Sequence, residues 1–201
     1  MTFTDWPHPL YVVDVEGNGA NPPDLVEVAA IPLTDGRPRP DEARQWLIRP
    51  PVPIPARISR IHGITNQMTT DAPAWPEIAD EVKRTLEGAW IAAHSASVEY
   101  HALGRHLPGW EPAGVLDTLR LAKHTEPGRP GYDLDALIER TGIDLSDAPG
   151  TRHRAGYDAH ATAQLLLHLA ERYPTFAALQ AAAVPPGIPG RPQQQPEETL
   201  W

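Results

Sequence analysis

The chain is predicted to fold as an α/β domain with a mixed sheet flanked by helices. Three apolar segments rich in β-branched residues come first, at residues 10–16, 25–33 and near 46–48, and they are typical of consecutive strands. Two short apolar strands, at 89–93 and 115–116, then alternate with helical segments. At 201 residues, the chain is long enough for one domain with a buried core.

The strands are predicted from their β-branched and apolar residues, and the helices from the spacing of apolar residues along the chain. Val12, Val13 and Val15 are typical of a strand buried within a sheet. The third strand runs into the proline-rich segment 50–55, which must be an extended connection. Apolar residues recur at helical spacing in four segments, one that starts at Trp75 and three over residues 97–107, 132–141 and 159–173. Gly142 is expected to end the third of these helices.

Three regions are expected along the chain. Residues 1–9 form an N-terminal extension and residues 10–183 the folded domain. Residues 184–201 form a Pro/Gln-rich tail that is predicted to be disordered, because its composition cannot supply a core. The tail ends in Leu200-Trp201, for which a stray apolar end is our primary interpretation. A short docking peptide for a protein partner such as a sliding clamp is the alternative.

Composition excludes several classes of site. The chain has no cysteine, which excludes disulfides and thiolate zinc sites. It shows no signal segment and no membrane span, so a soluble cytoplasmic protein is expected. The net charge of −9 argues against broad binding to a long duplex. A nucleic-acid enzyme remains compatible with this charge, because metal ions in an acidic pocket supply local positive charge.

Asp14 and Glu16 lie two residues apart on the first predicted strand, so their carboxylates point to the same face. Two anions this close on a buried strand repel each other and need a cation, for which Mg²⁺ or Mn²⁺ is suited. The turn Gly17-Asn18-Gly19 lets backbone N–H groups approach whatever lies over the carboxylates. A metal-free Asp-x-Glu pair on a solvent-facing strand is the alternative.

A second group of candidate residues lies downstream. Asp158 falls in the first turn of the strongest predicted helix, where the helix dipole favours a carboxylate with or without a metal. His153 precedes it in a loop and is suited to deprotonating a water, although a surface turn residue is the alternative. Glu99 begins the helix after the fourth strand and can be directed toward Asp14. For His94, at the end of that strand, a hydrogen-bonded structural role is our primary interpretation.

Taken together and in this order, these segments resemble the DEDDh (DnaQ-like) 3′–5′ exonucleases, which include the proofreading subunit of bacterial DNA polymerase III. The three family motifs are similar to residues 14–19, 94–99 and 153–158. The resemblance covers roughly residues 10–172 and has further support at 61–65, 71–75 and 116–119.

The resemblance implies a ribonuclease H-like fold with three antiparallel strands followed by two parallel ones. It implies a two-metal mechanism with Mg²⁺ or Mn²⁺, in which His153 is the general base and the ligands are Asp14, Glu16, Glu99 and Asp158. The substrate would be a single-stranded DNA or RNA 3′ end, released as nucleoside 5′-monophosphates. The residues expected to hold the terminal nucleotide are Gly17, Asn18, Gly19, His62, Gly63 and His94.

The chain departs from the family pattern at three places. Glu99 stands where the family has aspartate, Ser95 replaces the usual asparagine, and Gly17-Asn18 replaces a threonine pair. The first change raises an alternative function, a nucleic-acid or partner binding module whose catalysis is weakened by the longer Glu99 side chain. An endonuclease of the wider ribonuclease H-like group is a third hypothesis.

Overall fold

The computed structural model describes residues 6–191 and contains one mixed sheet. Strands β2, β1, β5 and β6 are neighbours in that order, and β4 pairs with the outer edge of β2. The pairs β1–β2 and β2–β4 are antiparallel, and β1–β5 and β5–β6 are parallel, which confirms the predicted sheet. The strands are β1 (Leu10–Gly17), β2 (Leu25–Thr34), β4 (Arg44–Leu47), β5 (Trp90–Ala93) and β6 (Gly114–Asp117).

A sixth strand, β3 (Arg37–Pro38), was not predicted. It pairs with the end of β2 through a two-residue turn, Asp35-Gly36, whose φ angles of 50° and 70° are both positive. An Asp-Gly pair favours this turn because both residues tolerate the left-handed region. The strand is only two residues long, too short to produce a recognisable pattern.

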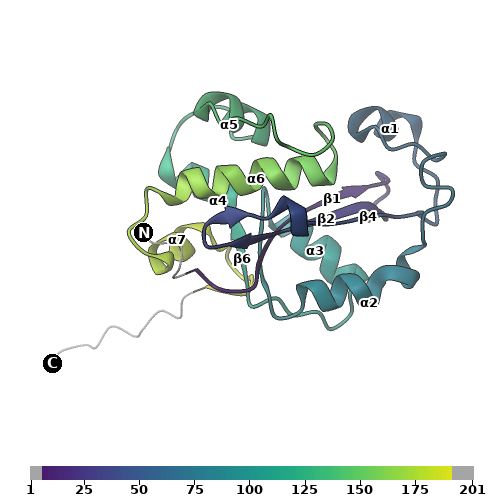
Figure 1. Ribbon diagram of the computed structural model, residues 1–201, viewed down its shortest axis with the longest axis horizontal. Helices are drawn as coiled ribbons and strands as arrows, with labels where there is room; N and C mark the ends of the chain where they lie inside the picture. Colours follow the sequence, from purple (N-terminus) through teal and green to yellow (C-terminus); the bar gives the residue numbers. More distant parts are fainter. Residues whose placement is uncertain (1–5, 192–201) are drawn as a thin grey trace.

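Helices cover both faces of the sheet (Figure 1). Helix α6 (Ala155–Ala170) crosses one face, and its core cluster includes residues of three other helices: α4 (Thr118–Thr125), α5 (Leu134–Thr141) and α7 (Phe176–Ala183). On the other face, α2 (Trp75–Leu86) and α3 (Ser97–His106) pack on β1, β2 and β5. Helix α1 (Ala56–His62) lies beyond the C-terminal end of β1.

The alternation of side chains along β1 determines where the carboxylates lie. Leu10 and Val12 belong to the core cluster under α6, whereas Val13 belongs to the cluster under α2 and α3. Asp14 and Glu16 continue the Leu10–Val12 face, because residues two apart on a strand share a side. Both carboxylates therefore point toward the side on which α6 lies.

The helices differ from the sequence prediction in extent. Helices α1, α4 and α7, each seven or eight residues long, were not predicted. Helix α6 begins at Ala155 and not at residue 159, because Glu27 on β2 accepts the N–H of Ala155. No helix among residues 6–191 is long and apolar enough to cross a membrane.

The folded region extends beyond the predicted boundary at residue 184. Val184 and Ile188 are buried, and the N–H of Val115 donates to the carbonyl of Pro189 at 3.1 Å. Trp6, in the predicted N-terminal extension, is also buried in the core under α6. The candidate docking peptide at Leu200-Trp201 lies outside the described residues.

We expect residues 184–191 to contribute to stability. A chain ending at Ala183 should lose about 3 kcal/mol of unfolding free energy relative to one ending at Arg191, because Val184 and Ile188 leave the core. Urea unfolding of the two truncated chains measures the difference. Equal unfolding free energies would show that the packing of this segment adds no stability.

Candidate active site

Three carboxylates meet where the C-terminal end of β1 approaches the first turn of α6. One oxygen from each of Asp14, Glu16 and Asp158 lies within 4.8 Å of the others. Burial and mutual repulsion raise the pKa of Asp14 well above its usual value, and burial raises the pKa of Glu16 to about 8. The pKa of Asp158 is raised as well, mainly by burial. Ionising all three carboxyl groups therefore requires added positive charge.

Glu99 supplies a fourth carboxylate from the first turn of α3. Its side chain is only 6% exposed, and burial raises its pKa to about 8. Glu99 also raises the pKa of Asp14 more than any other neighbouring charge does, so it lies near Asp14, outside the group of three whose oxygens lie within 4.8 Å of one another. Its Oε2 atom is buried without a hydrogen-bond partner among the described residues. The unpaired oxygen and the hard oxygen donors beside it fit a divalent cation.

His153 lies at the solvent side of this cluster. Its Nδ1 is 4.0 Å from Oδ2 of Asp158, and its side chain is 45% exposed. The backbone of His153 has a φ of 61°, in the left-handed region that a residue with a side chain seldom occupies. This conformation, directly before α6, brings the ring beside Asp158 while leaving it open to solvent.

An ion pair that sequence reasoning missed connects α6 to the sheet. Glu27, on β2, is completely buried, and the Arg154 guanidinium donates to both of its carboxylate oxygens. The N–H of Ala155 and the side-chain amide of Gln45 also donate to Glu27, each at 2.9 Å. The sequence signal was a charged residue, Glu27, within an otherwise uncharged strand.

The loop after β1 is held in one conformation by hydrogen bonds of the Asn18 side chain. The carboxamide of Asn18 accepts the N–H groups of Ala20 and Asp24 at 3.1 and 3.0 Å and donates to the Asp24 carboxylate at 2.9 Å. Asn18 is 1% exposed, so its side chain shapes the loop from inside. Gly19 has a φ of 74°, and a Cβ there would lie 2.6 Å from Ile58 of α1. The loop therefore packs directly on α1.

His62 and Gly63 end helix α1 beside this loop. His62 is buried, its Nδ1 accepts the N–H of Ile64 at 3.0 Å, and its ring interacts with the backbone of Gly17. Burial lowers the pKa of His62, which favours the neutral ring. Gly63 adopts the left-handed conformation, with a φ of 75°, that ends the helix. Gly17 and His62 are thus neighbours, as the expected substrate cradle requires.

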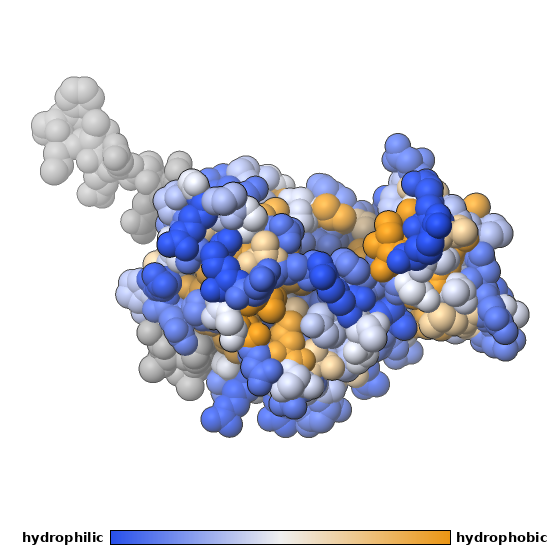
Figure 2. Space-filling model, turned by 90° about the horizontal axis from the view of Figure 1, so that it is seen from above, coloured by the Kyte–Doolittle hydropathy of each residue, from blue (hydrophilic) through white to orange (hydrophobic). Residues whose placement is uncertain are grey.

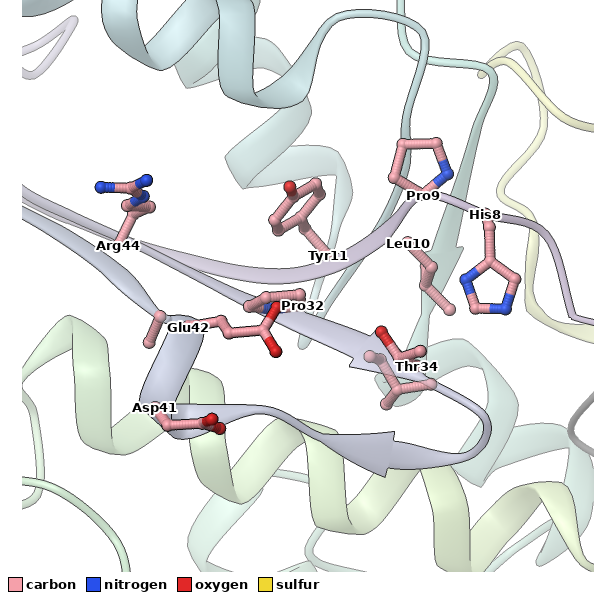
Figure 3. Close-up of a pocket in the computed structure, with 11 residues that line it drawn as sticks. His8, Pro9, Leu10, Tyr11, Pro32, Thr34, Asp41, Glu42 and Arg44 are labelled. Atoms are coloured by element: carbon pink, nitrogen blue, oxygen red, sulfur yellow. The ribbon is translucent and has the colours of Figure 1, made fainter.

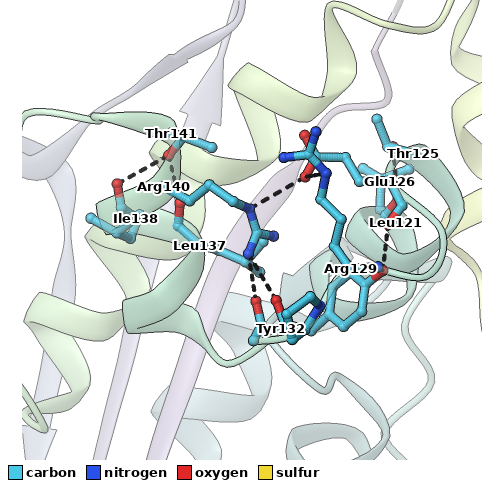
Figure 4. Close-up of polar contacts among 11 residues, drawn as sticks. Leu121, Thr125, Glu126, Arg129, Tyr132, Leu137, Ile138, Arg140 and Thr141 are labelled. Carbon is cyan, nitrogen blue, oxygen red and sulfur yellow. Dashed lines mark hydrogen bonds and ion pairs between the residues drawn. The ribbon is translucent and has the colours of Figure 1, made fainter.

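His94 is held by two hydrogen bonds. Its Nδ1 lies 2.9 Å from the Thr118 hydroxyl and its Nε2 lies 2.9 Å from the carbonyl of Tyr132. Tyr132 closes a loop in which Arg140 bonds to the carbonyls of Pro130 and Gly131 and pairs with Glu126 at 3.3 Å (Figure 4). Because both ring nitrogens of His94 are hydrogen-bonded, the side chain connects this loop to the end of β5.

Asp117, at the end of β6, supports the second motif. One of its carboxylate oxygens accepts the N–H of Ser95 at 3.2 Å and that of Arg120 at 3.1 Å. Ser95 has a φ of 73°, a left-handed conformation that asparagine adopts more readily than serine. The bond to Asp117 holds the backbone in this conformation ahead of Glu99.

A separate cavity of about 730 Å³ lies at the opposite end of β1. Figure 3 shows that its lining comes from the start of β1, with His8 and Tyr11, the end of β2, with Thr34, and the segment containing Glu42 and Arg44. None of the four carboxylates lines this cavity. It is not the candidate active site.

The comparison with known families accounts for this arrangement. The sequence model of the RNase_T family, described as an exonuclease, matches residues 11–166 and so includes all four carboxylates and His153. The chain belongs to this exonuclease family. Its relatives confirm the resemblance to DEDDh (DnaQ-like) 3′–5′ exonucleases and the ribonuclease H-like fold.

Three relatives illustrate the similarity of this exonuclease domain to known proteins. It is 33% identical over 184 residues to the 3′–5′ exonuclease DinG of Bacillus subtilis (strain 168), covering 84% of the chain and 19% of that protein. It is 32% identical over 162 residues to exodeoxyribonuclease 10 of Escherichia coli (strain K12), covering 80% and 68%. The structure of exonuclease X in complex with 5′ overhanging duplex DNA has a TM-score of 0.72 and 29% identity, covering 86% and 97%. The chain spans between 12% and 23% of the length of the longer curated relatives.

The raised pKa values predict how the stability of the metal-free exonuclease domain depends on pH. Unfolded Glu16 and Glu99 ionise near their usual pKa of 4.5, but in the folded protein they ionise near 8. The folded state binds more protons at these two groups throughout this interval. His62, His94 and His160, whose pKa values are lowered from 6.5, act in the opposite sense only below about 6.5. The unfolding free energy should therefore fall as the pH rises from about 6.5 to about 8. Glu27, whose pKa is lowered, acts only below this interval.

Urea unfolding in a chelator, at several pH values across the interval, measures this dependence. Adding Mn²⁺ should reduce it, because the cation stabilises the ionised carboxylates. Stability that rises steadily with pH from about 6.5 to about 8 in chelator would contradict the assignment of raised pKa values to this cluster.

Proposed function

We propose that the chain is a divalent-metal-dependent 3′–5′ exonuclease that hydrolyses the terminal phosphodiester bond of single-stranded DNA or RNA. The products would be nucleoside 5′-monophosphates. The observation that carries this proposal is the group of carboxylates Asp14, Glu16 and Asp158 beside the buried, unpaired Glu99. Within the described part of the chain, no Lys or Arg forms an ion pair with Asp14, Glu16 or Glu99.

Asp14, Glu16, Glu99 and Asp158 would hold two Mg²⁺ or Mn²⁺ ions. When bound, such ions lower the pKa of the attacking water and stabilise negative charge on the leaving oxygen. The protein contributes a fixed set of donors from three elements, β1, α3 and α6, that need not reorganise during the reaction. The longer side chain of Glu99 is compatible with this role because it reaches the vicinity of Asp14.

His153 would act as the general base. Its ring is exposed and lies beside Asp158, so it can take a proton from a water and release it to solvent. The other two histidines near the motifs are unsuited to this task. His62 is buried against Gly17, and both ring nitrogens of His94 are hydrogen-bonded.

The backbone of residues 17–19, with His62 and Gly63, would hold the terminal nucleotide. The adjoining segment supports contact with a polyanion, because residues 49–70 contain three arginines and no aspartate or glutamate in a chain of net charge −9. Arg57, Arg60, Val52 and Ile61 are exposed in this segment. Figure 2 shows apolar and polar side chains side by side on the right of the molecule, where α1 lies in Figure 1.

The direct test is a nuclease assay on 5′-labelled single-stranded DNA and RNA of matched sequence, with Mg²⁺, Mn²⁺ or a chelator. We expect a ladder that shortens one nucleotide at a time from the 3′ end and disappears in chelator. Tight binding of the oligonucleotide without cleavage in either metal would favour the binding module instead.

Asp14→Asn should reduce hydrolysis by at least about a hundredfold, because a central charged donor is lost. The same change should raise the unfolding free energy of the metal-free protein by about 1 kcal/mol, because it removes one anion from a repulsive cluster. Single-turnover cleavage and urea unfolding in chelator measure the two effects. Asp80→Asn, on the exposed side of α2, is the matched control, and undiminished cleavage by Asp14→Asn would refute the site.

His153→Ala should slow cleavage by about 10²- to 10⁴-fold with little change in Mn²⁺ affinity, because the ring transfers a proton without holding the ion. Cleavage rates between about pH 6 and 9, together with calorimetric titration of Mn²⁺, separate these effects. His101→Ala changes an exposed histidine of α3 and serves as the control. If His153→Ala and the parent cleave equally fast across this range, His153 is not the base.

A further inference from the structure

We propose that Arg154, through its ion pair with Glu27, is a positioning residue that sets Asp158 and His153 against strand β1. The proposal rests on the proposed function, since it concerns the assembly of that metal site. It assigns a role to three residues that are neither among the proposed metal ligands nor in the expected substrate cradle: Arg154, Glu27 and Gln45.

The contacts of Glu27 form a complete hydrogen-bonded site. Oε2 accepts Nε of Arg154 at 3.0 Å and the N–H of Ala155 at 2.9 Å. Oε1 accepts a terminal nitrogen of Arg154 and the side-chain amide of Gln45. Each oxygen thus has two donors, in a side chain that is completely buried. Such saturation is what allows a buried charge to define one geometry.

Arg154 transmits this geometry to the reacting groups. It directly follows His153, and its own carbonyl accepts the N–H of Asp158 at 3.0 Å, the first helical bond to that residue. A displacement of residue 154 would therefore move both His153 and Asp158. On the sheet side, Glu27 lies opposite Glu16 in the β1–β2 register. The ion pair thus connects the α6 half of the site to the β1 half.

The charge of Arg154 is neutralised by Glu27 and not by the metal ligands. Because the guanidinium is bound to both oxygens of Glu27, it forms no ion pair with Glu16. The Glu16 carboxylate remains available to a cation.

Gly156 permits the close approach of α6 to β4. A Cβ at residue 156 would lie 2.9 Å from Oε1 of Gln45, the side chain whose amide donates to Glu27. A larger residue there would require the Gln45 carboxamide to shift from its present position beside Glu27. The ion pair, Gln45 and Gly156 therefore form one packed unit, which we call the α6 clamp.

The test is the double variant Glu27→Gln/Arg154→Gln. Replacing both partners avoids the uncompensated buried charge that either single change would leave. We expect about tenfold weaker Mn²⁺ binding in calorimetric titration without nucleic acid, and about a hundredfold lower kcat at saturating Mn²⁺. The KM for the oligonucleotide should change little, because neither side chain is hydrogen-bonded to residues 17–19, 62 or 63 of the expected cradle. Arg39→Gln/Glu42→Gln removes an exposed ion pair and is the control.

Unchanged Mn²⁺ affinity and kcat in the Glu27→Gln/Arg154→Gln variant would overturn the proposal. A parent chain that neither binds Mn²⁺ nor cleaves would instead refute the proposed function, so the two failures are distinguishable.

A second test keeps both charges. Gly156→Ala should weaken Mn²⁺ binding severalfold, and adding Gln45→Ala should restore it to the level of Gln45→Ala alone. A loss that Gln45→Ala does not relieve would contradict the α6 clamp.

Discussion

Repulsion among buried carboxylates is the constraint on which the rest of the structure depends. Asp14, Glu16 and Asp158 are held within 4.8 Å of one another although burial already disfavours each anion. Left to itself, such a group would separate or remain protonated. The fold opposes separation by placing two of the carboxylates on a central strand and the third on a helix packed over that strand. The stability of the surrounding core therefore maintains an arrangement that is unfavourable without a cation.

The sheet and the helices contribute differently to this arrangement. Strand β1 pairs with β2 along its length, including Asp14 and Glu16, and with β5 over residues 10–12, so the backbone that carries the two carboxylates is anchored in the sheet. Helix α6 instead begins at the site, and a helix end can shift by fraying. Glu27 counters that freedom by accepting the first N–H of α6 together with the Arg154 side chain. The buried ion pair thus gives a helix terminus the rigidity that pairing gives the strand.

Much of this fold was predictable because its strands carry strong local signals. The valines of β1 and the apolar run of β2 identify buried strands, and Asp14 and Glu16 share a face by the geometry of any strand. The contacts that organise the site are not local. Arg154 lies 127 residues from Glu27, and His94 bonds to a carbonyl 38 residues away. A buried glutamate in β2 indicates that some partner exists, but only the packed structure identifies Arg154.

Net charge and local charge act at different ranges in this molecule. An excess of nine negative charges would repel a polyanion over distances comparable to the Debye length, about 8–10 Å at ordinary ionic strength. The arginines of residues 49–70 lie on the segment that includes α1, which packs against the loop after β1. A nucleic-acid end close to that segment would experience the nearby positive charges more strongly than the distant negative ones. This distribution suits an enzyme that holds a few terminal nucleotides, because a long duplex would extend over acidic surface and lose the advantage.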